Sequence, residues 1–328
     1  MSGTFTQMPF RPQQAHLARL AKWHCITSRS SPHPIVLVEN VAGLCTGYDA
    51  AKTAKSKGEP DSESNLSYLL QRMNDMGYVA PHSILNPKSR TAACRRRVWL
   101  PCFYCPQLEG DSQELQAFAE QAEGLLQIMS EPTSICHSFT DMLIDDFHPE
   151  FAYWSRQAAS ERRLRPSSEK FEKWKMSHTQ KYMAAGLQWP PVYSPEFKNL
   201  IMQQKLTERE AEIVHFYDRT NDCSVLLADD CLIDLSQSLQ RSTPKPGQAP
   251  CIIPGAHLWL RRRCRWLTAF EAVLCQGYDP PAGQVLRHFT HRKIIDLIGN
   301  SFHCDSCLVC LAAALACAPS MQTLQMGS

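Results

Sequence analysis

The feature that most constrains the fold is a short apolar run, Ile35-Val36-Leu37-Val38, which follows a stretch rich in Ser, Pro and His. Such a run, mostly β-branched, is typical of a strand buried on both faces, as in the parallel sheets of α/β domains. Residues 66–76 then predict a short helix that closes at Gly77, and residues 78–85 and 97–103 predict two more strands. This order predicts the α/β class, with an antiparallel ribbon at the closing edge of a mixed sheet.

The middle of the chain has a different pattern of polar and apolar residues. Asp111 with Glu114, and Thr207 with Glu210, form capping-box patterns that predict helices over 111–129 and 207–217. Polar, proline-containing stretches lie between and around these helices. We therefore expect an inserted region with its own small core.

From Trp259 onward the sequence pattern resembles that of the first part of the chain again. Residues 268–276 predict a helix followed by Gly277, and an apolar terminal helix is expected from Ser301 or His303 to Ala318. The predicted domains are 1–105 and 256–328 for one core, with 106–255 as a variable insertion between them.

Composition indicates the cellular compartment of the protein but not its function. A formal net charge of +2 does not indicate nucleic-acid binding by itself, and local arginine runs are more often solvated surface than phosphate contacts. The sequence predicts no signal peptide and no membrane span, so we expect an intracellular protein without a membrane partner.

The fifteen cysteines are then expected to be reduced thiols. The spacings Cys102-x-x-Cys105 and Cys304-x-x-Cys307-x-x-Cys310 resemble zinc motifs, but the second set falls along one helix face, as small buried residues would. Because no compact loop joins the two groups, we predict no metal site.

Three separated motifs carry a family resemblance. They are Glu39-Asn40-Val41 after the apolar run; Arg95-Arg96-Arg97-Val98-Trp99 preceded by Gly77-Tyr78; and Arg265-Trp266-Leu267-Thr268 with Glu271, Gln276-Gly277-Tyr278 and Ile298-Gly299-Asn300-Ser301. In this order and at these spacings, the chain resembles the C-terminal part of the catalytic domain of cytosine-5 DNA methyltransferases. The resemblance implies an incomplete Rossmann-like sheet of the S-adenosylmethionine-dependent methyltransferases, with 106–255 as a mostly helical region resembling a target-recognition region.

The resemblance implies catalytic roles for Glu39, Arg95 and Arg97. Glu39 would bond the cytosine N3 and exocyclic amine and so assist attack at C6. Arg97 would reach the cytosine carbonyl oxygen, and Arg95 would support the same pocket. The family pattern starts with glutamine, and this chain departs from it by having Ala93 or Cys94 at that position. The alternatives are a structural ion pair for Glu39 and an edge-strand basic run for the arginines.

The resemblance also implies a cofactor site at Asn300 and Ser301, near the carboxylate of S-adenosylmethionine. At a helix start, free backbone amides would suit that carboxylate. The other interpretation is a common Gly-Asn turn followed by a serine N-cap. Arg265 is expected to brace the insertion against the core. DNA with a flipped base is the implied partner, in the nucleus.

Two family motifs are missing from their expected places. No Phe-x-Gly-x-Gly turn occurs, and no Pro-Cys pair precedes Glu39, where the family places its nucleophile. Cys25 lacks an adjacent proline and is not expected to replace it. We therefore predict a truncated methyltransferase that is inactive alone and needs a second polypeptide for its missing half. A non-catalytic DNA-binding or scaffold remnant, and a tRNA cytosine-5 methyltransferase relative, stay open as alternatives.

Overall fold

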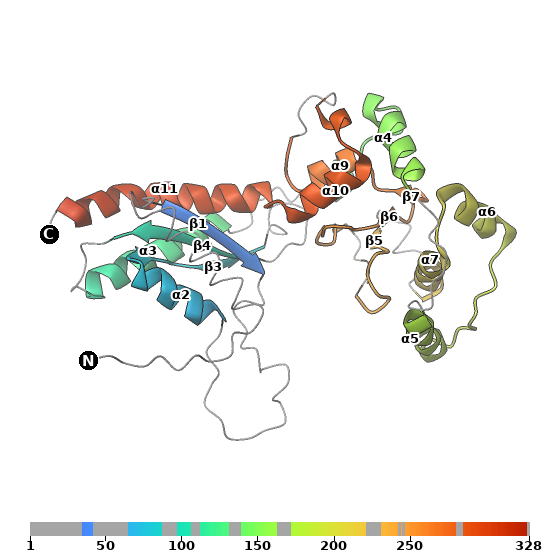
Figure 1. The fold of residues 1–328 in the computed structure, drawn as a ribbon, viewed down its shortest axis with the longest axis horizontal. Helices are drawn as coiled ribbons and strands as arrows, with labels where there is room; N and C mark the ends of the chain where they lie inside the picture. The colour runs from blue at the N-terminus through green and yellow to red at the C-terminus, as the bar shows by residue number, and fades with distance from the viewer. Residues whose placement is uncertain are drawn as a thin grey trace, which may run out of the picture. The chain divides into compact units, whose positions relative to one another are not determined.

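The structure is a computed structural model, shown in Figure 1. It describes residues 35–41, 65–86, 97–105, 112–130, 139–162, 172–220, 231–241, 244, 247–279 and 285–326. The chain divides into two compact units, and each is described by itself. The sheet unit comprises 1–86, 96–131 and 306–328, and the helical unit comprises 87–95 and 132–305.

The sheet unit is built on a four-stranded sheet. Its elements are β1 (Ile35–Val41), α2 (Asn65–Asp75), β2 (Tyr78–Val79), β3 (Ser83–Leu85), β4 (Arg97–Tyr104), α3 (Ser112–Ser130) and α11 (Cys304–Met326) from residue 306 onward. Strand β4 is central: β1 pairs along one side of it, while β2 and β3 pair with it elsewhere along its length. Every described pairing in this sheet is antiparallel.

Helices cover both faces of this sheet. The side chains that pack with α2 come from alternate positions of β1 and β4, namely Val36, Val38, Val98, Leu100 and Cys102. Ile35, Leu37, Trp99 and Phe103 occupy the other set of positions and pack with α3 and α11. This alternation is the two-residue period of a strand, and it gives a helix–sheet–helix sandwich.

The α/β class is therefore observed, but β1 differs from its expected form. The apolar run does form a strand, and the strand continues through Glu39 to Val41. Its described side chains are half-buried rather than buried, and its described partner β4 is antiparallel. The expectation of a fully buried, parallel-type strand was wrong for this part of the sheet. The helices that cover the two faces of the sheet account for the apolar, β-branched sequence of β1, whatever the direction of its neighbouring strand.

The predicted strand over 78–85 is interrupted. It forms β2 and β3, with Pro81 between them, because proline lacks the N–H that a continuous ladder needs. The interruption leaves a gap between the β3 register, which ends at Trp99, and the β2 register, which begins at Phe103. Pro101 of β4 lies in this gap, and among the described strands it pairs with Leu37 of β1 alone. A proline inside the central strand is thus tolerated where one neighbour is missing.

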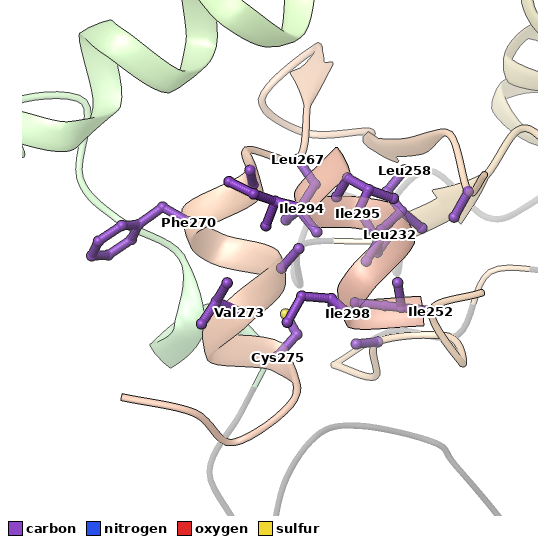
Figure 2. Packing of buried hydrophobic residues seen from close by; sticks show 14 of the residues in the cluster. Leu232, Ile252, Leu258, Leu267, Phe270, Val273, Cys275, Ile294, Ile295 and Ile298 are labelled. Atoms are coloured by element: carbon purple, nitrogen blue, oxygen red, sulfur yellow. The ribbon is translucent and has the colours of Figure 1, made fainter. Parts of the chain in front are cut away.

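The helical unit contains a small sheet and many helices. Its elements are η3 (Phe139–Met142), α4 (Pro149–Ser160), α5 (Glu172–Ala184), α6 (Pro195–Gln204), α7 (Glu208–Thr220), β5 (Leu232–Asp234), β6 (Leu258–Leu260), β7 (Arg265–Trp266), α9 (Ala269–Cys275), η5 (Leu286–His288) and α10 (His291–Asn300). The antiparallel sheet has the order β5-β6-β7. One apolar cluster joins α9 and α10 to β5 and β6, as Figure 2 shows with Leu232, Leu258, Val273 and Ile295.

The compact units divide the chain differently from the expected domains. Helix α3 was placed in the insertion, but its Phe118 and Leu126 pack with β4 of the sheet unit. Conversely, residues from 256 to 305 pack with the preceding segment: Leu267 and Phe270 share a cluster with Trp154 of α4. Amphipathic faces, rather than the polar stretches between them, determine which segments pack together.

One described segment meets the length and composition of a membrane span. His291–Cys317 has a mean hydropathy of 1.3 in its most apolar window, and 39% of that window is buried inside the molecule. Core helices pass the same test, so this is weak support for a span. The absence of a membrane partner stays a prediction.

Candidate functional site

The structure brings Glu39 and Arg97 into contact. In the β1–β4 register Glu39 lies opposite Trp99 and Val41 lies opposite Arg97, so Glu39 and Arg97 are diagonal neighbours on one face. The Arg97 Nε atom lies 2.9 Å from Oε1 of Glu39. Two motifs that are far apart in sequence therefore meet on a single surface of the sheet.

Burial makes this pair electrostatically strong. The side chains are 18% exposed for Arg97 and 12% for Glu39. At 2.9 Å the charges attract, yet this buried oxygen accepts no hydrogen bond of ordinary geometry from the described residues. Oε1 could therefore accept a hydrogen from an amine placed against it.

The same contact is also the structural ion pair that the sequence left open for Glu39. A carboxylate and a guanidinium that neutralise each other on one sheet face stabilise the β1–β4 pairing without any ligand. The geometry thus permits both roles. The catalytic assignments of Glu39 and Arg97 stay predictions, and Arg95, with Ala93 and Cys94, lies outside the described residues.

Asn300 and Ser301 are not at a helix start. Asn300 is the last residue of α10, and Ser301 is its C-cap. The Asn300 Nδ2 atom donates to the Asp296 carbonyl at 3.0 Å, while the Ser301 N and Oγ atoms donate to the Ile298 carbonyl at 3.1 and 2.8 Å. The expected supply of free amides is wrong here, because a helix C-terminus presents carbonyl oxygens. The cofactor role stays a prediction without that support, and both residues belong to the helical unit.

Gly299 has a packing role that differs from the turn expected of the Gly299-Asn300 pair. A Cβ atom at this position would lie 2.2 Å from the Pro254 nitrogen and 2.3 Å from the Ile253 carbonyl carbon. Gly299 is therefore a close-approach glycine inside α10, where the helix packs against the backbone of another segment. It does not end one helix or begin the next, as a Gly-Asn turn would.

The third motif forms a buried polar network in the helical unit. Arg265 donates from Nη1 and Nη2 to the two carboxylate oxygens of Glu271 at 2.9 and 2.8 Å. Thr268 and Glu271 form a capping box at the start of α9, and the Ile144 amide also donates to Glu271. The Arg265 guanidinium lies over the Phe151 ring. The motif thus joins β7, α9 and the segments around α4 within the helical unit, and the expected bracing of the insertion against the core by Arg265 stays a prediction.

The chain contains two Pro-Cys pairs outside the family's expected position. Cys102, after Pro101, is fully buried in β4, and burial raises the pKa of its thiol far above the ordinary value. Cys251, after Pro250, is half-buried in the segment before β6. A buried neutral thiol is a poor nucleophile. Cys25 lies outside the described residues.

The zinc-like spacing at the start of α11 belongs to a packed helix. Cys310 is buried against the sheet, and burial raises the pKa of its thiol to about 12. Cys304 and Cys307 are half-buried. Among the described residues no cluster of three His, Cys, Asp or Glu side chains could hold a metal ion. A metal-free protein stays a prediction.

A second buried polar cluster gave no signal in the sequence. Glu212 of α7 accepts hydrogen bonds from Trp189 Nε1 at 3.2 Å and lies 2.7 Å from Nδ1 of His178 on α5. His178 and Glu212 are each 2% exposed. These residues are scattered in three segments, so only the packed fold brings them together. They hold α5 against α7.

Comparison with solved structures gives remote likenesses, two of which are described below. No protein-family model and no curated protein matches the chain. The crystal structure of the S. pombe Dnmt2 methyltransferase aligns with 94% of this chain and 72% of its own, at 13% identity and a TM-score of 0.38. A triple mutant of Spodoptera frugiperda DNMT2 aligns with 96% of this chain and 76% of its own, at 10% identity and a TM-score of 0.35. At these values the likeness assigns neither membership nor activity, so any functional assignment depends on the residues.

Proposed function

We propose that the chain is part of a cytosine-5 methyltransferase-like protein that retains the cytosine-recognition groups and cannot transfer a methyl group by itself. The observation that carries the proposal is the contact between Glu39 and Arg97. In this proposal the sheet unit is the second half of a Rossmann-like methyltransferase sheet. The substrate is DNA, with a nuclear location, and the second polypeptide supplies the other half.

The pair suits one edge of a cytosine ring. Cytosine presents an exocyclic amine that donates, and a carbonyl oxygen that accepts. A carboxylate such as Glu39 bonds the amine and, when it carries a proton, the ring N3, while a guanidinium such as Arg97 donates to the carbonyl oxygen. Because Oε1 of Glu39 is buried without a hydrogen-bond donor, a base amine would satisfy it.

A bound base must partly replace the ion pair. At 2.9 Å the Glu39 and Arg97 side chains close on each other, so the ring edge can enter only when they separate or slide. The ring would then be held between opposite charges in a partly desolvated site, where such hydrogen bonds are strong. Uracil, which has a carbonyl in place of the amine, would set an acceptor against the Glu39 carboxylate and be rejected.

The described residues do not fit the methyl donor well. The side-chain and backbone donors of Ser301 bond the Ile298 carbonyl, and Asn300 bonds Asp296. The sequence also contains no Gly-x-Gly turn for the nucleotide part of S-adenosylmethionine. We therefore propose that this chain alone binds S-adenosylmethionine weakly or not at all, and that the donor is used only with a second polypeptide.

A non-catalytic DNA-binding role is the second candidate, and the state of the thiols favours it. Addition at C6 of cytosine needs a thiolate, and burial raises the pKa of Cys102, Cys105, Cys275, Cys307, Cys310 and Cys317. A chain that recognises cytosine and supplies none but such neutral thiols would bind a flipped base without modifying it, and the six thiols named here belong to the described residues.

Binding to oligonucleotides with one unpaired base tests the proposal. Fluorescence anisotropy would compare a DNA duplex with an unpaired cytosine against the same duplex with an unpaired uracil, and a tRNA against both. We expect cytosine to bind at least tenfold more tightly, and Glu39→Gln to abolish the difference. Thermal melting of the variant would verify that the β1–β4 pairing survives. Equal affinity for the two bases would show that the pair is structural only.

A further inference from the structure

A buried carboxylate of the helical unit holds the ring of a half-exposed histidine. Nδ1 of His257 lies 2.7 Å from Oε1 of Glu210, and the two side chains are 32% and 2% exposed. Because an ionised carboxylate only accepts hydrogen bonds, the hydrogen of this contact is carried by Nδ1. The contact therefore fixes the tautomer of the neutral His257 ring and leaves its lone pair on Nε2.

Glu210 is anchored so that one of its oxygens serves His257. The other oxygen, Oε2, accepts from Nη2 of Arg162 at 2.5 Å and from the amide and hydroxyl groups of Thr207, each at 2.9 Å. Burial alone would raise the pKa of Glu210, but the hydrogen bond with His257 and the charge of Arg162 lower it to about 2. The carboxylate is therefore an anion at neutral pH, and among the described residues Oε1 bonds His257 alone.

The backbone of His257 is held on both sides. Its amide donates to Oδ1 of Asp234 at 3.2 Å, and its carbonyl accepts from the amide of Leu235 at 2.7 Å. By contrast, Nε2 of the ring is not buried and has no hydrogen-bond partner among the described residues. Nε2 is therefore a fixed lone pair that a small molecule can reach from solvent.

The other two carboxylate–histidine pairs among the described residues each lack one of these properties. His178 and Glu212 also lie 2.7 Å apart, but both side chains are 2% exposed, so a reagent in solvent does not reach the ring. His82 and Glu123 lie 3.2 Å apart with side chains 36% and 42% exposed, so that carboxylate is solvated rather than anchored in the interior. His257 combines an anchored anionic partner with an accessible ring nitrogen.

A histidine in this arrangement is suited to accept a transferred group. As Nε2 forms a new bond the ring becomes positively charged, and an anionic carboxylate at Nδ1 stabilises that charge. We propose that His257 is a phosphoryl-acceptor site, modified at Nε2 by small anionic phosphoryl donors of the phosphoramidate class. The Nε2 lone pair attacks phosphorus and forms an N–P bond. The P–N bond of the donor breaks and ammonia leaves with the electron pair, while the Nδ1 hydrogen stays in its hydrogen bond with Glu210.

The surroundings of His257 favour a phosphoryl group over a metal ion or an acyl group. Among the described residues no three His, Cys, Asp or Glu side chains cluster to hold a metal ion, so Nε2 would be a single ligand. An acyl group on an imidazolium ring open to water is lost rapidly by hydrolysis, whereas a phosphoryl group on histidine persists longer at neutral and alkaline pH. The proposal involves the helical unit alone and is independent of cytosine recognition by Glu39.

Reaction of the full chain with phosphoramidate tests the proposal. Mass spectrometry of peptides, handled at alkaline pH, would follow phosphorylation of each histidine with time. We expect His257 to react at least tenfold faster than His288 of η5, which is exposed and bonds no described carboxylate. The buried His178 should stay unmodified. Glu210→Gln should slow the reaction at His257 at least tenfold and leave the rate at His288 unchanged.

A second measurement uses the wild-type chain and does not depend on the folding of a variant. ¹⁵N NMR should show the neutral His257 ring with its hydrogen on Nδ1, which is the minor tautomer of free histidine. A hydrogen on Nε2, or equal rates at His257 and His288, would overturn the proposal. So would a Glu210→Gln variant that is folded by circular dichroism and reacts as fast as the wild type. Selective acylation of His257 by diethyl pyrocarbonate without phosphorylation would also overturn it, since the site would then accept acyl groups.

Discussion

Among the described glycines whose surroundings are given, Gly299 has the least space for a side chain. Its Cβ position is filled by the backbone of Ile253 and Pro254, which cannot move as a flexible side chain would. We predict that Gly299→Ala destabilises the chain by about 1–3 kcal/mol or more, the usual cost of overpacking. Urea-induced unfolding followed by tryptophan fluorescence measures the change.

The control is a glycine with open space around it. Gly124 lies in the exposed interior of α3 with no atom within 4 Å of its Cβ position. Gly124→Ala should raise the free energy of unfolding by about 0.5–1 kcal/mol, because alanine favours the helix. Equal effects at the two positions would contradict the close approach at Gly299.

The Arg265–Glu271 pair gives a second prediction for single residues. Glu271 is fully buried and is held by two hydrogen bonds from Arg265. Glu271→Gln leaves the guanidinium charge buried without its partner, so we expect a loss of about 3–5 kcal/mol in unfolding free energy. Arg72→Ala breaks the exposed Arg72–Asp75 pair and should cost less than about 1 kcal/mol. A small effect at Glu271 would show that the network carries little of the stability.

Between elements, the Glu210 network joins α7 to the end of α4 and to the segment before β6. Glu210 Oε2 lies 2.5 Å from Nη2 of Arg162, and Oε1 lies 2.7 Å from Nδ1 of His257. Burial alone would raise the pKa of Glu210, but the hydrogen bond with His257 and the Arg162 charge outweigh it and lower the pKa to about 2. The carboxylate therefore stabilises the folded chain.

The direction of the shift fixes the pH dependence. The folded pKa of Glu210 is about 2, against 4.5 for the ordinary group. Its contribution is therefore complete above the ordinary value and is lost as the pH falls toward 2. We predict that Glu210→Gln lowers the unfolding free energy near neutral pH, and that the difference from wild type shrinks in acid. A difference that stays constant across this range, measured by urea titration at each pH, would contradict the assignment.

Local patterns predicted individual elements well. The helices α2, α3, α7 and α9 occur where apolar periodicity and capping pairs indicated them, and Thr268 with Glu271 forms the capping box of α9. The direction of strand pairing could not be predicted. A sheet with helices on both faces favours the same apolar, β-branched strand sequence whether the neighbouring strand is parallel or antiparallel. At Gly299 the sequence suggested a turn. The glycine is instead required because the backbone of Ile253 and Pro254 passes close to it, and this contact between distant segments leaves no local sequence pattern.

At the scale of the whole molecule, the sequence predicted part of the site and not the packing around it. The motifs placed Glu39 and Arg97 on one surface, and the strand register brings them to 2.9 Å. The same motifs could not reveal that Asn300 closes α10 or that Cys102 is buried, since both depend on tertiary contacts. Compact units likewise follow amphipathic faces, so α3 joins the sheet unit.

The most direct measurement is transfer of a labelled methyl group from S-adenosylmethionine to cytosine in DNA, with tRNA assayed in parallel. Three samples are compared: the chain alone, the chain with a second polypeptide that supplies a glycine turn and a Pro-Cys loop, and that mixture with Glu39→Gln. We predict no transfer by the chain alone, transfer by the mixture, and a loss of about a hundredfold or more with Glu39→Gln. Robust transfer by the 328-residue chain alone would contradict the account, because one of its own thiols would then be the nucleophile.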